Sequence, residues 1–248
     1  MVGPSQDRVK NQLLREMASE DYAIFQMLLV ATDLPKGMVL SEPGKPFSHA
    51  CFPDSGIGSI VALSPEGHRS EVGITGKEGM FGFTLLLEID RTPHETFMQV
   101  EGTGYIIEAD AVASACRTSL SLRAGLLRYV QAYSVQTSFT ALSNVTHSVE
   151  VRLARWLLMS HDRTEGDSIA LTHEFISLML GVTRSSVTLA LHMLEGANLI
   201  RSTRGRVSIR DRAGLEQLAH DAYGSAEDEY ERLIGPLRHQ NSRKRLSA

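Results

Sequence analysis

The stretch Leu171–Ile200 constrains the fold most, because it combines two helix starts, two apolar stripes and a glycine placed between them. Thr172 and Thr183 are good N-cap residues, since a threonine hydroxyl can accept a hydrogen bond from a free N–H group of the first helical turn. Gly181 permits a tight turn between the two helices. The pattern therefore predicts two helices joined at a sharp angle. Apolar residues follow each cap at helical spacing: Phe175, Ile176, Met179 and Leu180, then Val187, Ala190, Leu191 and Leu194.

The second of these helices, predicted over 184–194, has an outward face near its N-terminus. In a helix-turn-helix this end enters the major groove of DNA. An arginine can contact guanine, serine and threonine can reach bases or phosphates, and threonine and leucine offer a methyl group to thymine. A plain helical hairpin with scattered arginines is the alternative. The outward side chains are Arg184, Ser185, Thr188 and Leu189.

The segment Leu199–Ile209 reads as strand, basic turn and strand. A basic hairpin directly after a helix-turn-helix is typical of a wing. Its arginines, Arg204 and Arg206, would then lie on the DNA backbone. The two features together predict a winged helix-turn-helix with double-stranded DNA as partner.

The net charge of −4 argues at first against a nucleic-acid partner. The charge is unevenly distributed, however: residues 1–150 contain 11 Lys and Arg against 17 Asp and Glu, and residues 151–248 contain 14 against 12. Ser168–Arg212 contains 6 Arg against 3 acidic residues. This local basic charge is compatible with DNA contact, although a solvated surface would show it too.

The N-terminal half has a different pattern of apolar and turn residues. Residues 6–30 show apolar residues at helical spacing, which predicts a helix. Residues 32–108 consist of short apolar segments separated by glycine- and proline-containing turns, which predicts a small antiparallel β-barrel of the jelly-roll type or a sandwich. We expect strands at 57–63, 71–75 and 96–100, so the fold class is α+β.

Residues 109–162 contain no proline and one glycine, Gly125, and their apolar residues again follow helical spacing. We expect two or three helices, including a long one over about 119–143. A long amphipathic helix of this kind can form a dimer seam, or it can pack on its own barrel. Beyond the predicted wing, two short helices are expected at Arg212–Tyr223 and Ala226–Leu237, followed by a basic tail that includes Arg243, Lys244 and Arg245. The predicted domains are 1–147, 148–212 and 213–248.

Several other classes of protein are excluded. Cys51 and Cys116 lie far apart and form no CxxC pair, so a disulfide scaffold or an all-cysteine metal site is not expected. No apolar run reaches the roughly 18–20 residues of a membrane helix, and the N-terminus lacks a signal-peptide core. We therefore expect a cytoplasmic protein with no membrane contact, no metal and no cofactor.

The order of these elements resembles the bacterial regulators of the cyclic-AMP receptor protein and fumarate–nitrate regulator (Crp/Fnr) superfamily. The resemblance covers nearly the whole chain and is most specific over Val151–Ile209. The segments that carry it are Arg152-Leu-Ala-Arg-Trp-Leu-Leu, Leu171-Thr, Leu180-Gly-Val, Arg184-Ser-Ser-Val and Leu194-Glu-Gly-Ala-Asn-Leu-Ile.

The resemblance implies a transcription regulator, not an enzyme, that forms a homodimer through the long helix and works with RNA polymerase. It implies a cyclic-nucleotide-binding-like barrel and an inverted-repeat DNA site with half-sites roughly 34 Å apart. By the same resemblance, Arg184, Ser185, Thr188 and Leu189 read bases. Ser185 stands where many members have a glutamate, so a different DNA sequence is expected. The phosphate-facing positions would be Thr172, His173, Thr183, Ser186, Arg204 and Arg206.

The residues that would form the effector pocket of such a regulator depart from the motif of the members that bind a cyclic nucleotide. Members that bind a cyclic nucleotide have a Gly-Glu pair and, further on, an arginine followed by a hydroxyl residue. Here Phe83 takes the place of that glutamate and Glu95 that of the arginine, where it would repel a phosphate by several kcal/mol at an effective dielectric near 20. We expect an effector other than cyclic AMP, and a cyclic-nucleotide-responsive regulator is the alternative. The pocket positions are Gly82, Phe83, Thr84, Arg91, Glu95, Thr96, Thr137 and Ser138, of which the last two resemble the adenine-contacting hydroxyls.

Two further alternatives concern metals. Iron–sulfur members need a cluster of N-terminal cysteines, and none precedes Cys51. Cys51, His49 and His68 could be haem or metal ligands, but lone His and Cys residues in strands are usually structural. A cupin-like metal enzyme is the remote alternative, and it needs clustered His and Glu ligands that the predicted barrel lacks.

Overall fold

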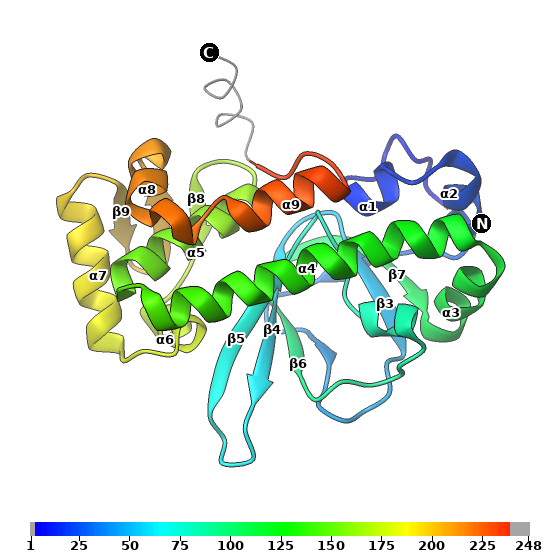
Figure 1. The fold of residues 1–248 in the computed structure, drawn as a ribbon, viewed down its shortest axis with the longest axis horizontal. Coiled ribbons are helices and arrows are strands. Elements are labelled where there is room, and N and C mark those ends of the chain that lie inside the picture. The colour runs from blue at the N-terminus through cyan, green and yellow to red at the C-terminus, as the bar shows by residue number, and fades with distance from the viewer. Residues whose placement is uncertain (1–2, 239–248) are drawn as a thin grey trace.

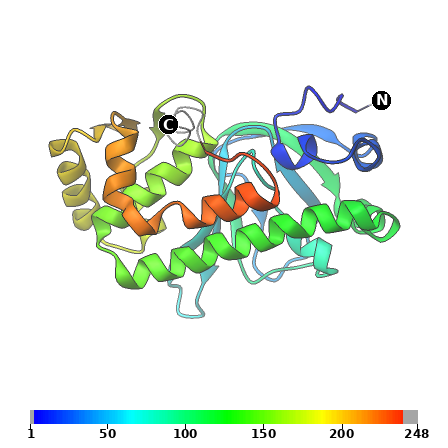
Figure 2. The same cartoon turned by 45° about the horizontal axis from the view of Figure 1, so that its top comes forward.

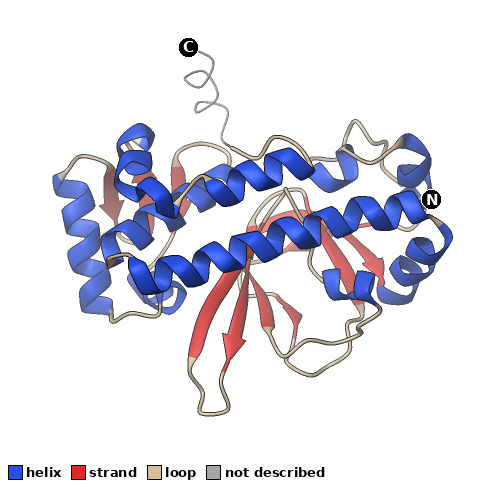
Figure 3. Cartoon of the chain, in the orientation of Figure 1, coloured by secondary structure: helices blue, strands red, loops and turns tan. Residues whose placement is uncertain are grey.

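A computed structural model describes residues 3–238, in which a β-rich half is followed by a long helix and a second, mainly helical half (Figure 1). Figure 3 shows most strands gathered beneath the long helix, with a small separate sheet in the second half. The expected α+β class is therefore confirmed. The basic tail at 243–245 lies outside the described residues.

The β-rich half contains seven strands in two antiparallel sheets that do not close on each other, so the predicted antiparallel β domain is present in the open, sandwich-like form. The sheets have the orders β1-β7-β3 and β2-β6-β4-β5, and the isolated bridges Pro46–Arg91 and Cys51–Phe81 add local pairing outside the named strands. The strands expected at 57–63, 71–75 and 96–100 are confirmed. The bounds are β1 Val30–Leu34, β2 Val39–Ser41, β3 His49–Pro53, β4 Ile57–Leu63, β5 Arg69–Thr75, β6 Glu95–Val100 and β7 Gly102–Glu108.

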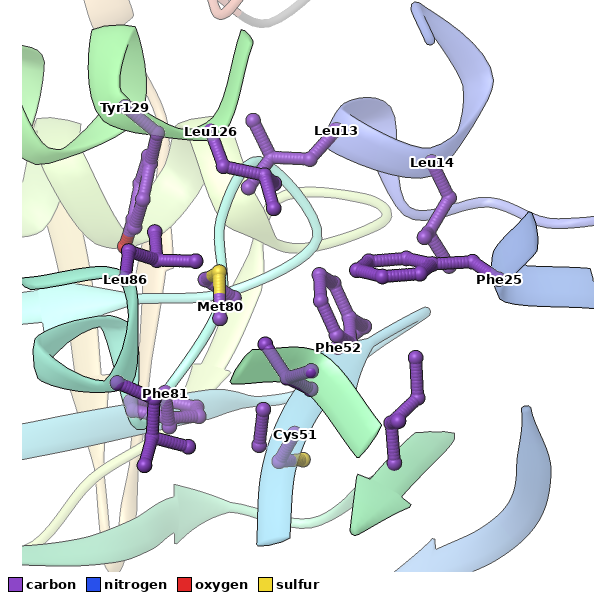
Figure 4. Packing of buried hydrophobic residues seen from close by; sticks show 14 of the residues in the cluster. Leu13, Leu14, Phe25, Cys51, Phe52, Met80, Phe81, Leu86, Leu126 and Tyr129 are labelled. Carbon is purple, nitrogen blue, oxygen red and sulfur yellow. The ribbon is translucent and has the colours of Figure 1, made fainter. Parts of the chain in front are cut away.

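Side chains from both sheets meet in one core with the N-terminal helices and the long helix (Figure 4). Phe25 and Phe52 pack edge to face with ring centroids 5.7 Å apart. Leu126 and Tyr129 of the long helix point into the same core near Met80. The long helix is thus part of the first half on one of its sides.

The single helix expected over residues 6–30 is wrong. The chain forms two short helices, α1 (Gln12–Arg15) and α2 (Ser19–Gln26), and Val30 begins β1, where it pairs with Ile106. Asn11 caps α1 and also donates from Nδ2 to the carbonyl oxygens of Pro53 and Gly79, at 2.8 Å each. These contacts with distant segments override the local periodicity.

Three helices connect the halves: α3 (Ala109–Thr118), α4 (Leu120–Thr146) and α5 (Val149–Arg163). Ser119 caps α4 by accepting a hydrogen bond from the N–H of Leu122, and Ser148 caps α5. The predicted long helix is therefore present as α4 and extends three residues further than expected. The link between α4 and α5 is short.

The second half follows α5. The small sheet has the order β8-β10-β9, and the predicted C-terminal helices lie after it. Both end earlier than expected, at Ala219 and Leu233, and a 3-10 turn follows the first. The bounds are β8 Ser168–Ala170, α6 His173–Leu180, α7 Arg184–Gly196, β9 Ile200–Thr203, β10 Arg206–Ile209, α8 Arg212–Ala219, η2 His220–Ala222 and α9 Ser225–Leu233.

The last helix, α9, returns to the first half and runs alongside α4 (Figures 1 and 2). Tyr230 of α9 is buried in the core of the β-rich half, and its hydroxyl donates to the carbonyl oxygen of Glu78 at 2.6 Å. The C-terminal extension therefore ties the second half to the first.

Buried polar contacts from α5 make the same connection. Arg163 Nε donates to Glu78 Oε1 at 2.8 Å, and both side chains are 2% exposed. Trp156 Nε1 donates to Glu71 Oε1 at 2.8 Å. An unpaired charge in such a place would be costly, so each of these contacts favours one fixed orientation of the two halves.

No single helix among residues 3–238 is long and apolar enough to cross a membrane. Helices α6 and α7 reach the length and hydropathy of a membrane span only when the two are taken together across their sharp bend. Their apolar faces are buried in the core of the second half, which accounts for their composition.

Candidate nucleic-acid interface

Helices α6 and α7 meet at 104°, within the range typical of a helix-turn-helix. Gly181 ends α6 with φ 61° and ψ 38°, a left-handed conformation that glycine adopts without steric cost. Its N–H donates to the carbonyl oxygen of Leu178. The turn expected at Gly181 is therefore present.

Both predicted caps are formed. Thr172 Oγ1 accepts a hydrogen bond from the N–H of Phe175, and Thr183 Oγ1 accepts one from the N–H of Ser186, each at 3.2 Å. Inside, Val187, Ala190 and Leu191 of α7 are fully buried. The caps and this buried stripe fix the rotation of α7 about its own axis.

The outer face of α7 carries the four side chains predicted to read bases. Arg184, Ser185 and Leu189 are exposed, and Leu189 is 61% accessible. Thr188 is half-buried, and its hydroxyl donates to the carbonyl oxygen of Arg184 at 3.0 Å. The side chain of Thr188 is therefore held by its own helix, whereas Ser185 Oγ lies 2.8 Å from Thr183 Oγ1 at the cap.

Arg184 forms an ion pair with Glu174 in the first turn of α6. Both side chains are well exposed, so this pair contributes little to stability. It does hold the guanidinium near the turn between the two helices. Glu174 was not predicted to lie beside Arg184. The local signal for it is an acidic residue in the first turn of a helix that begins after the cap Thr172.

The positions predicted to face phosphate surround the same end of α7. His173 Nδ1 lies 3.1 Å from Thr188 Oγ1, which links the starts of the two helices. Ser186 Oγ lies 2.9 Å from Thr183 Oγ1. The first N–H groups of α7 lie here too, and a helix N-terminus attracts anions.

The wing is a β-hairpin formed by β9 and β10. Arg204 and Gly205 form its two-residue loop, and Gly205 has φ 75°. Arg204 and Arg206 are exposed, and Arg206 Nη1 donates to Ser168 Oγ of β8 at 3.2 Å. The hairpin thus presents two arginines on a supported sheet.

The β-rich half contains a pocket of about 610 Å³ between the strands and α4. Its lining is mainly apolar, with aromatic and aliphatic side chains from strands, loops and α4. Six of the eight predicted effector positions line it. These six are Gly82, Phe83, Thr84, Arg91, Thr96 and Thr137.

The other two predicted pocket residues lie elsewhere. Glu95 pairs with Arg69 of the neighbouring hairpin, and Ser138 is exposed and donates to the carbonyl oxygen of Ser134. Arg91 lines the pocket, but it makes two 2.9 Å hydrogen bonds to the carboxylate of Asp90. Glu95 therefore does not line the pocket, where it was expected to repel a phosphate. The positive charge of Arg91 is offset by the carboxylate of Asp90.

Cys51 and Cys116 are free and buried. Burial raises the pKa of Cys51 to about 12, so its thiol is an inert core residue. His68 is largely exposed in an ion pair with Glu66. Cys51, His49 and His68 do not form a metal-ligand cluster among the described residues.

Comparison with known proteins identifies the class. Residues 151–218 match the Crp-like helix-turn-helix domain. This segment contains α6, α7 and the wing, so this part of the chain is a helix-turn-helix domain of the Crp-like type. No curated protein matches the chain.

Several solved structures share the fold across both halves at low sequence identity. FixK2 from Bradyrhizobium japonicum has a TM-score of 0.67 at 17% identity, covering 79% of this chain and 99% of its own. TTHB099, a Crp-family transcriptional regulator from Thermus thermophilus, has a TM-score of 0.66 at 20% identity, covering 78% and 99%. The c-di-GMP-responsive regulator CLP from Xanthomonas campestris has a TM-score of 0.62 at 18% identity, covering 77% and 99%. The resemblance to the Crp/Fnr superfamily is confirmed.

Proposed function

We propose that this protein is a sequence-specific DNA-binding regulator that reads bases with the outer face of α7. The observation that carries the proposal is the arrangement of Arg184, Ser185 and Leu189 on the exposed side of a capped helix whose other side is fully buried. Thr188 would contribute its methyl group, because its hydroxyl is already bonded within the helix. Arg184 would exchange its ion pair with Glu174 for guanine.

Phosphate contacts would surround the outer face of α7. Thr172, His173, Thr183 and Ser186 lie at the N-terminal ends of α6 and α7, and Arg204 and Arg206 lie on the wing. Contacts of this kind position a protein on DNA without reading its sequence. The division predicts different behaviour for substitutions in the two sets.

We propose a homodimer that pairs through the mostly exposed side of α4, on which Leu127 packs in part against the core of the β-rich half and Ser134 lines its pocket. This side carries residues at alternating four- and three-residue spacing, as in a coiled-coil seam. Its ends are apolar, with Leu120 77% exposed and Val145 87% exposed. The stripe is Leu120, Ala124, Leu127, Gln131, Ser134, Ser138, Ala141 and Val145.

A two-fold dimer would place two copies of α7 in successive major grooves. The site should then be an inverted repeat with half-sites about one helical turn apart, roughly 34 Å. Because Ser185 cannot accept a hydrogen bond from cytosine as strongly as a carboxylate, the half-site should differ from that of members with glutamate there.

Selection of bound duplexes from a random pool tests both parts of this proposal. We expect an enriched inverted repeat, and light scattering should show a dimer of the full chain. A Val145→Asp substitution on the exposed seam should weaken the dimer, whereas the matched change Val39→Asp, on an exposed strand of the β-rich half, should leave it intact. Enrichment of a single, non-repeated site by a monomer would contradict the proposal.

The pocket of the β-rich half supports an effector other than cyclic AMP. Its lining is mostly apolar, and its one arginine, Arg91, is already paired with Asp90. Thr137 does line the pocket, which is the observation that favours a cyclic-nucleotide-responsive regulator instead. Calorimetry with cyclic AMP and cyclic GMP decides between them: no heat from either supports our proposal, micromolar binding of cyclic AMP contradicts it, and binding of cyclic GMP alone favours the cyclic-nucleotide-responsive alternative.

The remaining expectations follow from the same proposal. A regulator of this kind would act in the cytoplasm, without catalytic activity and without a membrane, and would work with RNA polymerase. It would need no cofactor for DNA binding itself. The proposed domains are 1–147 for sensing and dimerisation, 148–212 for DNA binding and 213–248 as an extension.

A further inference from the structure

The turn that joins the two halves brings together three metal-ligating side chains that are far apart in the sequence. His147 follows the last residue of α4, and His220 and Asp221 lie in η2. One ligand atom from each residue lies within 4.8 Å of the other two. His147 Nε2 is 3.1 Å from Asp221 Oδ1, and His220 Nδ1 contacts the same carboxylate. His147 and Asp221 are 74 positions apart, so no short motif indicates the cluster.

The surroundings of His147 favour a metal-binding tautomer. Its side chain is 10% exposed, and Nδ1 lies 3.2 Å from Ser143 Oγ and 3.3 Å from Thr146 Oγ1. A proton on Nδ1 can be donated to these hydroxyls, which leaves the lone pair of Nε2 directed at Asp221. Metal-binding histidines are commonly oriented in this way by a hydrogen bond at the other ring nitrogen.

The donor set fits one class of ion. Two imidazoles and a carboxylate suit Zn²⁺, whose ligand atoms lie about 2.0–2.2 Å from the metal and therefore roughly 3.3 Å from each other in a tetrahedron. The 3.1 Å separation between His147 Nε2 and Asp221 Oδ1 is close to this value. His220 and Asp221 are 55% and 78% exposed, so solvent can reach the site and supply a fourth ligand.

We propose that His147, His220 and Asp221 form a divalent transition-metal site, selective for Zn²⁺ over Mg²⁺, at the junction of the two halves. The site is separate from the pocket of the β-rich half and from the DNA-binding face. A bound ion would link the end of α4 to the segment after α8, which packs on α5. It would therefore fix the direction in which α5, and with it α6 and α7, leaves the long helix.

Cobalt absorption tests the site without any use of DNA. Metal-free full-length protein titrated with Co²⁺ should develop the visible bands of a low-symmetry, nitrogen-ligated ion at one equivalent per chain, and Zn²⁺ should displace it whereas Mg²⁺ should not. Asp221→Asn, on an exposed side chain that should not affect folding, and His147→Gln should each weaken binding about tenfold or more. The matched control His68→Gln removes an exposed histidine on the hairpin between β4 and β5 and should bind as the unaltered chain does.

Absence of the cobalt bands from the unaltered chain would overturn the proposal, because the cluster would then be only an ion pair between His147 and Asp221. Bands that persist in both Asp221→Asn and His147→Gln would overturn it as well. The effect on orientation rests on the proposed DNA-binding function and has its own test: Zn²⁺ should change the affinity for the selected duplex at least about threefold, and Asp221→Asn should abolish that response while keeping the metal-free affinity. Cobalt binding with no change in DNA affinity would refute the coupling but retain the site.

Discussion

The outer face of α7 and the pocket of the β-rich half show two ways of building a candidate binding site. On α7 a single capped helix sets every side-chain direction, so Leu191 is fully buried while Leu189, two residues earlier, is 61% exposed. The pocket is lined by strands, the 3-10 turn η1 (Phe83–Leu87), loops and α4. A site on one helix depends on periodicity alone, whereas the pocket depends on how several segments pack together.

The same contrast extends to the halves themselves. The DNA-binding half has its own core, centred on α5, α6 and α7. The β-rich half has a larger core that also includes Tyr230 and Leu237 from the C-terminal extension. Buried contacts from α5 and α9 join the halves, so the position of α7 relative to the pocket depends on this junction.

The largest effect should come from breaking the junction. Glu78→Ala leaves the guanidinium of Arg163 buried without its carboxylate, which should lower the free energy of unfolding by about 3–5 kcal/mol. Urea denaturation measures this. The control Glu229→Ala removes the carboxylate partner of Arg232 in an exposed pair and should cost less than about 1 kcal/mol. Equal losses in the two variants would mean that the junction is not held by the buried pair.

The two sides of α7 can be separated by a matched pair of leucines. Leu191→Ala creates a cavity in the core of the DNA-binding half and should cost about 2–5 kcal/mol in thermal or urea unfolding. Leu189→Ala should change stability by about 0.5 kcal/mol or less and instead weaken binding to the selected duplex. If Leu189→Ala destabilised the fold as strongly as Leu191→Ala, the outer face would not be free.

The junction should also depend on pH through Glu71. Burial raises the pKa of Glu71 to about 7, although hydrogen bonds from Ser59 and Trp156 oppose the shift. The folded protein then keeps a proton that the unfolded chain releases above its ordinary pKa of 4.5. Stability should therefore be highest below about pH 4.5 as far as this group is concerned, and should fall by on the order of 3 kcal/mol as the pH rises to 7.

Glu71→Gln tests that dependence, because it replaces the carboxyl with a group that does not titrate. Unfolding by urea at several pH values between 5 and 7 should show a flatter slope for the variant. The exposed change Glu66→Gln, on the hairpin between β4 and β5, should keep the slope of the unaltered chain. An unchanged slope in Glu71→Gln would show that another group is responsible.

The sequence predicted most of the DNA-binding half, because each signal there was local. Caps at Thr172 and Thr183, the turn at Gly181 and the hairpin loop at Gly205 all depend on neighbouring residues. The residues predicted on the outer face of α7 are exposed for the same reason, although their contacts with DNA stay a prediction.

Predictions that depended on distant contacts were less successful. The single helix over 6–30 gave way to two short helices and a strand, because Asn11 bonds to distant carbonyls and Val30 pairs with Ile106. Glu95 was expected in the pocket but pairs with Arg69 across the sheet. The return of α9 along α4, and the meeting of His147 with His220, follow from tertiary packing that no local pattern contains.

The most direct test of the central claim compares Arg184→Ala with Arg206→Ala on the selected duplex and on a scrambled duplex, over a range of salt concentrations. Arg184→Ala should cost about 1–3 kcal/mol on the selected duplex and almost nothing on the scrambled one. Arg206→Ala should weaken both equally and lower the slope of log K against log salt by about one. Indistinguishable behaviour of the two variants would contradict the assignment of α7 to base reading and of the wing to the backbone.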